Sequence, residues 1–197
     1  MTLMSRFFSC AVFLVAVLAT TGAVAQSEKA SAESIEWISF EEAVERSKTD
    51  KRKILIDVYT DWCGWCKVMD KNTFTDKHIA SLISGAFYAV KLNAEQREPI
   101  TFRGTTFKHV QSGRNGYHEL AASLLQNELS YPNFVFLSED FKIIPLIPGK
   151  PSLPGYRKPE DFHFFLQYVA EERFMEMPVA DFQKIYKSPY RLKQPVN

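Results

Sequence analysis

A short apolar run followed directly by two closely spaced cysteines most constrains how this chain can fold. Residues 54–59 (ILIDVY) are rich in aliphatic and β-branched side chains and predict a buried strand, in which Asp57 is the one charge. The segment DWCGWC follows at 61–66, and Cys63 should lie where a helix begins. Free backbone N–H groups and the helix dipole stabilise a thiolate at such a position.

The N-terminus predicts export. Residues 1–25 contain Arg6 as their one charge, then an apolar run shorter than the roughly 20 residues that a spanning helix needs, and end in Ala-Val-Ala. This is the layout of a secretory signal peptide. We expect cleavage after Ala25, which removes Cys10, and a periplasmic or secreted protein that begins with a linker over 26–35.

The charge balance narrows the class of partner. The chain has 24 Lys and Arg and 23 Asp and Glu, and removal of residues 1–25 takes only Arg6 and leaves 23 of each. A neutral chain without a basic run argues against nucleic acid or an anionic membrane surface as the main partner. An apolar fraction of 46% agrees with a globular protein.

The pair Cys63 and Cys66 admits three chemistries. A purely structural disulfide would close a very small loop, so its entropic contribution to stability would be slight. A zinc site wants four ligands, but no second cysteine pair exists and the histidines are scattered, at His78, His109, His118 and His163. Redox exchange is favoured, because this spacing lets one thiolate attack a disulfide and its neighbour release the product. We expect no metal and no cofactor.

Four positions together resemble the thioredoxin-fold proteins of the exported thiol–disulfide oxidoreductase kind. The segment 62–66 matches the Trp-Cys-X-X-Cys active site of that family, and Asp57 stands six residues before the first cysteine, where thioredoxins have a buried aspartate. Lys91 lies in the next predicted strand, 87–93. Pro132, before the apolar run 133–137, matches the cis-proline of the family.

The resemblance implies a fold and a site. The fold is α/β, a central mixed sheet flanked by helices, over residues 36–172. Cys63 would be the nucleophile and Cys66 the resolving thiol. Asp57, with a raised pKa, would accept the proton of Cys66 through water, and Lys91 would modulate its proton affinity. The alternatives are an aspartate exposed on an edge strand and a solvated lysine.

A second set of residues is expected to hold the substrate. Trp62, Trp65 and Tyr131 would give an apolar surface around the thiols, beside Gly64, although tryptophans more often fill cores. A cis Pro132 would leave the backbone groups of Tyr131 free to pair with an extended polypeptide. The alternative is an ordinary proline at the start of a strand.

The remaining elements follow from spacing and capping patterns. We expect helices over about 40–48, with Ser39 and Glu42 as a capping box, from Asp76 to about Gly85, and from Pro159 onward. Strands are expected at 133–138 and 142–147. The separation of Lys91 from Pro132 predicts an insertion over about 94–126, with a hairpin at 102–107 and a helix at 116–125. The C-terminal extension, 173–197, is expected to form an extra helix.

The sequence leaves the direction of electron flow open. Gly64 and Trp65 between the cysteines match neither the Gly-Pro of reducing thioredoxins nor the Pro-His and Gly-His of strong oxidants and isomerases. We favour a reductase or isomerase of exported proteins, monomeric and supplied by a membrane electron donor. The competing class is a client-binding module with little redox turnover. The insertion either recognises a partner or has no role in function.

Overall fold

The computed structural model describes residues 34–190. The predicted signal peptide over 1–25, residues 26–33 of the predicted linker and the last seven residues of the C-terminal extension lie outside this range. Within it, none of the helices combines the length and the apolar character that crossing a bilayer requires.

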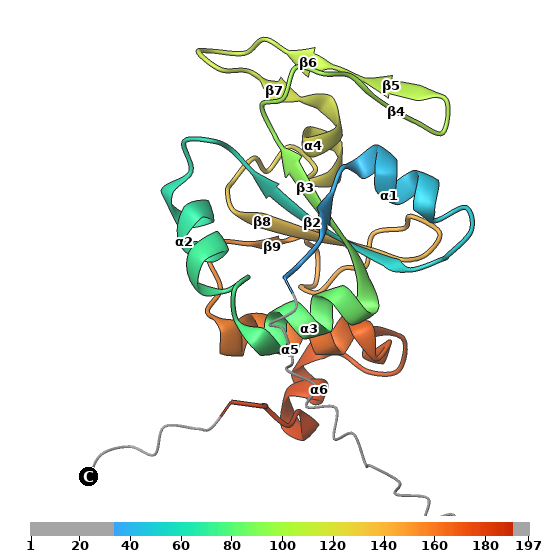
Figure 1. Ribbon diagram of the computed structural model, residues 1–197, viewed down its shortest axis with the longest axis vertical. Helices are drawn as coiled ribbons and strands as arrows, with labels where there is room; N and C mark the ends of the chain where they lie inside the picture. The colour runs from blue at the N-terminus through green and yellow to red at the C-terminus, as the bar shows by residue number, and fades with distance from the viewer. Residues whose placement is uncertain (1–33, 191–197) are drawn as a thin grey trace, which may run out of the picture. The chain divides into compact units, whose positions relative to one another are not determined.

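A five-stranded mixed sheet forms the centre of the described chain (Figure 1). The strand order is β1-β3-β2-β8-β9, with β1, β3 and β2 parallel and β8 and β9 antiparallel to their neighbours. The bounds are Trp37–Ile38 for β1, Lys53–Tyr59 for β2, Phe87–Asn93 for β3, Asn133–Leu137 for β8 and Leu153–Pro154 for β9. The predicted mixed sheet is confirmed. Strand β1 was not predicted, because two residues are too few to show an alternating pattern.

Helices cover both faces of this sheet. The helices are α1 (Phe40–Arg46), α2 (Gly64–Asn72), α3 (Lys77–Ala86), α4 (Glu119–Leu124), α5 (Pro159–Ala170) and α6 (Val179–Ile185), and a 3-10 turn, η1, spans Arg173–Met175. Buried residues of α1 and α4 join one hydrophobic cluster, and those of α2, α3, α5 and α6 join a second cluster. Figure 1 shows α3, α5 and α6 below the sheet and α1 and α4 above it.

The alternation of side chains along β2 decides where its one charge points. Ile54, Ile56 and Val58 belong to the cluster with α1 and α4, whereas Leu55 belongs to the cluster with α2, α3 and α5. Because successive side chains of a strand point to opposite faces, Asp57 lies on the same face as Leu55. The strand therefore directs its carboxylate toward the layer that contains the cysteine helix.

Side-chain caps fix the helix starts. The Ser39 hydroxyl accepts a hydrogen bond from the Glu42 N–H at 3.1 Å, which confirms Ser39 as the N-cap of α1. The Glu42 carboxylate accepts a hydrogen bond from Arg46 at 2.6 Å instead of reaching back, so the predicted capping box is half formed. Asp76 caps α3 by accepting hydrogen bonds from two N–H groups of its first turn.

The predicted strand over 142–147 is wrong. Ile143 forms an isolated bridge to Leu137 of β8 and Ile147 forms one to Lys150, and the strand that pairs with the other end of β8 is β9. Pro145 interrupts the segment, and a proline cannot donate to a strand ladder. Ile144 and Leu146 are nevertheless buried. These two side chains pack in the hydrophobic core although the segment is not a strand.

The insertion contains two hairpins and α4. Strands β4 (Ile100–Phe102) and β5 (Thr105–Phe107) form the first hairpin, as predicted, and β6 (His109–Val110) pairs with β7 (Tyr117–His118) in the second. The predicted helix over 116–125 is shorter than expected, because the ring of His118 accepts a hydrogen bond from the Leu120 N–H and acts as the N-cap. In the C-terminal extension, α6 buries Phe182.

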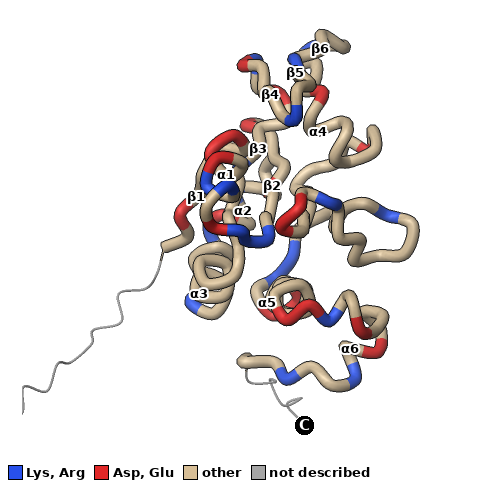
Figure 2. Tube along the Cα trace, turned by 90° about the vertical axis from the view of Figure 1, so that its right-hand side faces the viewer, with Lys and Arg blue, Asp and Glu red and all other residues tan. Residues whose placement is uncertain are grey.

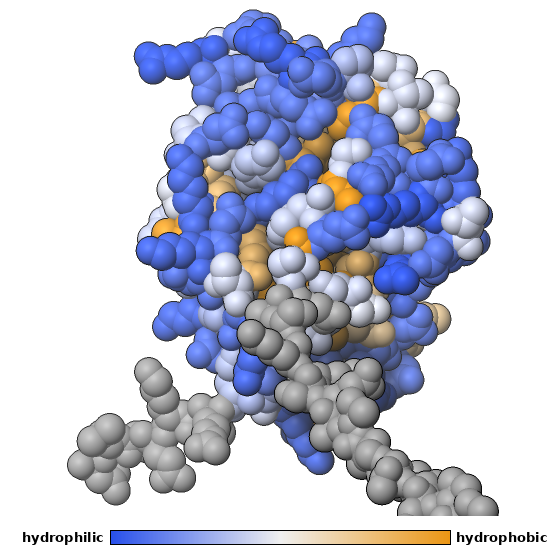
Figure 3. Space-filling view, viewed as in Figure 1, coloured by the Kyte–Doolittle hydropathy of each residue, from blue (hydrophilic) through white to orange (hydrophobic). Residues whose placement is uncertain are grey.

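Charged and apolar side chains are both distributed over the surface. Figure 2 shows Lys and Arg interspersed with Asp and Glu along the trace. The face in Figure 3 carries small apolar areas within a mainly hydrophilic surface. Most of the larger apolar side chains of the described residues are instead gathered in the two clusters on either side of the sheet.

Candidate active site

Cys63 and Cys66 form a disulfide at the start of α2. Strand β2 ends at Tyr59, and the Cys63 N–H donates to the Thr60 carbonyl at 3.1 Å, which turns the chain into the helix. Cys63 is the N-cap, and its Sγ accepts a hydrogen bond from the Cys66 N–H at 3.1 Å. The first turn of α2 contains no acidic residue. Backbone donors and the helix dipole therefore both favour negative charge on the Cys63 sulfur.

The two cysteines are almost equally buried. Cys63 is 4% exposed and Cys66 is 3% exposed in the disulfide form. The bond holds both sulfurs together at the helix start, which gives them one shared environment. Access to the pair is therefore set by the side chains around it.

Asp57 and Lys91 form a buried ion pair. Asp57 is directly opposite Lys91 in the parallel β2–β3 register, and Lys91 Nζ lies 2.7 Å from Asp57 Oδ2. The side chain of Asp57 is 1% exposed, and its Oδ1 has no hydrogen-bond partner among the described residues. Burial raises the pKa of Asp57 to about 6, against the opposing attraction of the Lys91 ammonium. The predicted burial of Asp57 and approach of Lys91 are confirmed.

Lys91 has a second carboxylate partner that the sequence analysis missed. Its ammonium binds Asp70 of α2 and lies 4.9 Å from the ring centre of Trp37, 5.1 Å from Tyr59 and 5.3 Å from Phe74. Burial favours the neutral amine, but the two carboxylates outweigh it and raise the pKa of Lys91. Lys91 is therefore a fixed cation.

Four aromatic side chains form a rim around the cysteines, called here the aromatic rim. Trp62 and Trp65 are each 61% exposed, as predicted for the surface around the thiols. The rings of Tyr131 and Trp62 pack edge to face with their centres 6.0 Å apart. The ring centres of Tyr156 and Trp65 are 5.3 Å apart. Burial, with a smaller contribution from Glu95, raises the pKa of Tyr131 to about 12. Tyr156 comes from the loop after β9, and no sequence signal marked it.

The segment at the head of β8 lies beside the rim. The Tyr131–Pro132 peptide bond is cis, the geometry that the resemblance implied. The Pro132 carbonyl accepts a hydrogen bond from the Gly155 N–H at 2.8 Å. Within residues 34–190, no hydrogen bond uses the backbone N–H or C=O of Tyr131. An extended polypeptide could therefore pair with Tyr131.

The insertion is connected to Trp62 through Glu95. The Trp62 indole N–H donates to Glu95 Oε1 at 2.8 Å, and the Asn115 amide donates to the same carboxylate at 3.1 and 3.3 Å. The Asn93 amide also donates to Asp61 at 3.2 Å. Sequence reasoning missed Glu95 and Asn115. The position of Glu95, just past the strand that carries Lys91, was the one available signal.

Residues 24–142 match the model of the Thioredox_DsbH family, described as a protein of unknown function, DUF255. This match covers more than half of the chain. The chain belongs to the Thioredox_DsbH family. A Helicobacter pylori structure described as a thioredoxin-fold protein superposes with a TM-score of 0.53 and 19% identity, over 79% of this chain and 89% of that chain. This member of the Thioredox_DsbH family therefore has the thioredoxin fold that its sequence predicted.

The relatives found by sequence are much longer proteins. The uncharacterized protein B0495.5 of Caenorhabditis elegans is 29% identical over 84 residues, which are 42% of this chain and 12% of that protein. Spermatogenesis-associated protein 20 of Homo sapiens is 26% identical over 84 residues, 42% of this chain and 11% of that protein. The match thus spans about a tenth of each of these relatives.

Two of the four histidines of this Thioredox_DsbH member, His109 and His118, lie in the insertion. His118 is fully buried, caps α4 with Nδ1 and places Nε2 3.2 Å from the Glu98 carbonyl. His109 Nδ1 lies 3.3 Å from the Gln96 carbonyl. Over residues 34–190, no three side chains of His, Cys, Asp or Glu are grouped as metal ligands.

Proposed function

We propose that this protein is a thiol–disulfide oxidoreductase that acts on thiols or disulfides of exported proteins through Cys63 and Cys66. The observation that carries the proposal is the Cys63–Cys66 disulfide at the N-terminus of α2, with Cys63 as the N-cap. A sulfur at that position is stabilised as a thiolate, which is the nucleophile and the leaving group of disulfide exchange.

In the reducing direction, exchange begins with the dithiol form. The Cys63 thiolate attacks one sulfur of a substrate disulfide, so that a Cys63–substrate disulfide forms and the other substrate sulfur leaves as a thiolate that takes up a proton. The Cys66 thiol then loses its proton and attacks Cys63 Sγ. The Cys63–Cys66 disulfide forms and the second substrate thiol leaves, so two electrons and two protons have passed to the substrate.

Asp57 is suited to accept the proton of Cys66. With a pKa of about 6, its carboxylate is mostly ionised at pH 7 yet binds a proton more readily than a solvated aspartate. Its Oδ1 has no partner among residues 34–190 and is available to a water molecule. In this proposal Lys91 holds the carboxylate in place and limits the rise of its pKa.

The aromatic rim suits a polypeptide substrate. Two tryptophans with 61% of their surface exposed offer apolar area beside the disulfide, and the backbone groups of Tyr131, which have no partner among residues 34–190, suit strand addition. Gly64 between the cysteines has nothing within 4 Å of where a Cβ would stand, which leaves room for a substrate backbone over the helix start.

The direction proposed is reduction or isomerisation. Each reductive cycle leaves the Cys63–Cys66 disulfide, so turnover in an oxidising compartment requires a dithiol reductant, for which we propose a membrane protein that passes electrons outward. We further propose export by the signal peptide over 1–25 and a monomeric protein in the periplasm or outside the cell.

The first test is the reduction potential of residues 26–197, measured by equilibration in glutathione buffers and counting of alkylated thiols. A potential near about −270 mV is expected for an electron donor, and one near roughly −180 mV for an isomerase. A potential near about −120 mV would contradict the proposed direction, because it marks a strong oxidant. Absence of a Cys63–Cys66 redox transition would overturn the function itself.

The second candidate is a client-binding module, which the exposed Trp62 and Trp65 favour. Cysteine variants separate the two classes, with insulin as the disulfide substrate and dithiothreitol as the reductant. For an oxidoreductase, Cys63→Ser abolishes the acceleration of insulin reduction over dithiothreitol alone. Cys66→Ala, reduced beforehand and then freed of dithiothreitol, accumulates a covalent mixed disulfide with insulin. A binding module would hold clients equally well in both variants. Full activity of Cys63→Ser would show that the nucleophile is misassigned.

A further inference from the structure

The Lys91 ammonium lies between two carboxylates that come from different elements. It is 2.7 Å from Asp57 Oδ2 of β2, and it also binds Asp70 Oδ1 of α2. We call this cluster the Lys91 triad. Its two carboxylates differ in setting, because the side chain of Asp57 is 1% exposed and that of Asp70 is 48% exposed.

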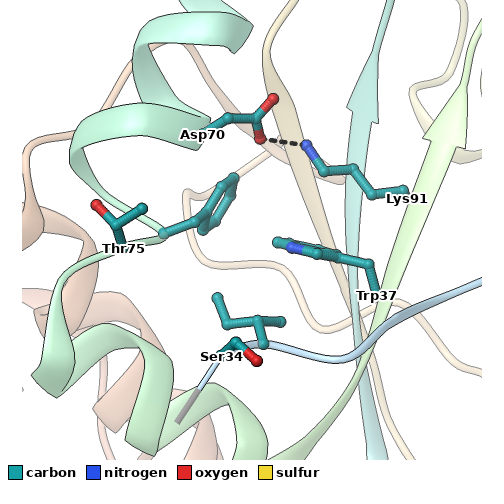
Figure 4. Close-up of a pocket in the computed structure, with 7 residues that line it drawn as sticks. Ser34, Trp37, Asp70, Thr75 and Lys91 are labelled. Carbon is teal, nitrogen blue, oxygen red and sulfur yellow. Dashed lines mark hydrogen bonds and ion pairs between the residues drawn. The ribbon is translucent and has the colours of Figure 1, made fainter. Parts of the chain in front are cut away.

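An open pocket gives the Lys91 triad contact with solvent. The pocket has a volume of about 560 Å³, and Asp70, Lys91, Trp37 and Thr75 lie on its walls (Figure 4). Asp70 projects from α2 toward the end of the Lys91 side chain in this view. Among the described residues that line the pocket there is no cysteine. The triad therefore has a route to solvent that is separate from the disulfide.

The charge count of the Lys91 triad explains what Asp70 contributes. One ammonium cannot neutralise two carboxylates, so the triad carries a net negative charge when Asp57 and Asp70 are both ionised. Binding one proton removes this charge, and the desolvated Asp57 gains more from neutralisation than the half-exposed Asp70 does. Without Asp70, Asp57 and Lys91 would form a neutral pair, and Asp57 would hold its proton less readily.

We propose that Asp70 is a positioning residue of the redox site, which holds Lys91 between two carboxylates and thereby keeps Asp57 able to bind a proton near neutral pH. This role rests on the proposed function, in which Asp57 accepts the proton of Cys66. Asp70 acts through Lys91 and has no contact with the reacting sulfurs in the proposal.

The other groups around Asp57 are few. From β2, Tyr59 has a pKa raised by burial and by the nearby carboxylates of Asp61, Asp57 and Asp70, against the opposing effect of the Lys91 ammonium. From β8, the residue opposite Asp57 is the apolar Phe134. From α2, the charged group that acts on Asp57 is Asp70, and from β3 it is Lys91. Tyr59 stays neutral below pH 8, so the two carboxylates and the ammonium set the titration.

The test is an NMR titration of Asp57 between pH 3 and pH 9, which records the side-chain carboxyl resonances of ¹³C-labelled aspartate. The protein is kept in the disulfide form, in which the cysteines do not titrate. We expect a midpoint near 6 for the unchanged protein. Asp70→Asn should lower the midpoint by about one pH unit, because the Lys91 ammonium then pairs with the Asp57 carboxylate alone. Asp70→Glu should restore it.

Asp140→Asn is the matched control, because Asp140 is an exposed aspartate that pairs with Lys51 away from the Lys91 triad. The proposal is overturned if Asp70→Asn leaves the midpoint unchanged, or if Asp140→Asn moves it equally. Insulin reduction by the same proteins is measured in parallel. A shifted midpoint in proteins that all fail to reduce insulin would reject the proposed function while supporting the control of Asp57 by Asp70.

Discussion

At the scale of single residues, Asp57 should make the stability of the protein depend on pH. Its pKa is raised from 3.8 to about 6 in the folded protein, so the folded state binds the proton more tightly than the unfolded state. The resulting stabilisation is complete below about pH 4 and is lost as the pH rises through 6. The difference corresponds to about 3 kcal/mol of unfolding free energy.

Urea unfolding of the wild-type protein and of Asp57→Asn at several pH values measures this contribution. The stability of Asp57→Asn relative to the wild type should increase by about 3 kcal/mol between pH 4 and pH 7. His118 and His163, whose pKa values are lowered by burial, act in the opposite sense but are common to both proteins. A constant difference across this range would show that Asp57 titrates as a solvated aspartate.

The same residue shows what the sequence could predict about the site. Asp57 and Lys91 were predictable because each lies in a strand whose pattern is clear, and strand register alone brings them together. Asp70 and Glu95 were not predictable. An acidic residue on a helix or after a strand is ordinarily solvated, and only the fold brings Asp70 of α2 to Lys91 of β3.

At the scale of elements, the insertion should hold the indole of Trp62. Asn115, in the turn of the second hairpin, donates to the carboxylate that accepts the Trp62 N–H. Removing one exposed hydrogen bond costs about 1 kcal/mol. Asn115→Ala should therefore speed the solvent exchange of the Trp62 indole proton by about three- to tenfold, measured by NMR, and Glu95→Ala should speed it further.

Ser112→Ala is the control for this prediction, because Ser112 lies in the same exposed turn and its hydroxyl makes no hydrogen bond within residues 34–190. It should leave the exchange rate unchanged. An unchanged rate in Asn115→Ala would mean that Glu95 holds Trp62 without help from the insertion.

Element type was predictable where a helical pattern agreed with a start signal, which is a side-chain cap for α1 and α3 and Pro159 for α5. The prediction of element type failed at 142–147, where an apolar run suggested a strand. Burial of Ile144 and Leu146 explains that composition, but the segment pairs with β8 only through the bridge from Ile143 to Leu137, because Pro145 interrupts it. A run of apolar residues indicates burial more directly than it indicates strand pairing.

At the scale of the whole described chain, the C-terminal extension should belong to the same cooperative unit as the thioredoxin fold. Phe182 of α6 is 3% exposed and contacts Phe164 and Tyr168 of α5 with ring centres 5.4 and 5.3 Å apart. The Tyr168 hydroxyl donates to the Met177 carbonyl at 2.6 Å. Farther along, the Tyr190 hydroxyl donates to Asp76, the cap of α3, at 2.6 Å. The extension thus connects two helices of the fold.

Phe182→Ala tests this arrangement. If α6 unfolds together with the sheet, truncating a buried phenylalanine should lower the global unfolding free energy by about 3 to 5 kcal/mol, with one transition in circular dichroism and in tryptophan fluorescence. Ile185→Ala, in the same helix at 55% exposure, should cost less than about 1 kcal/mol. If the extension opened independently, the global midpoint would be unchanged in Phe182→Ala, and only the amide protons of α6 would exchange faster. The redox site would then depend on the sheet and α2, α3 and α5 alone.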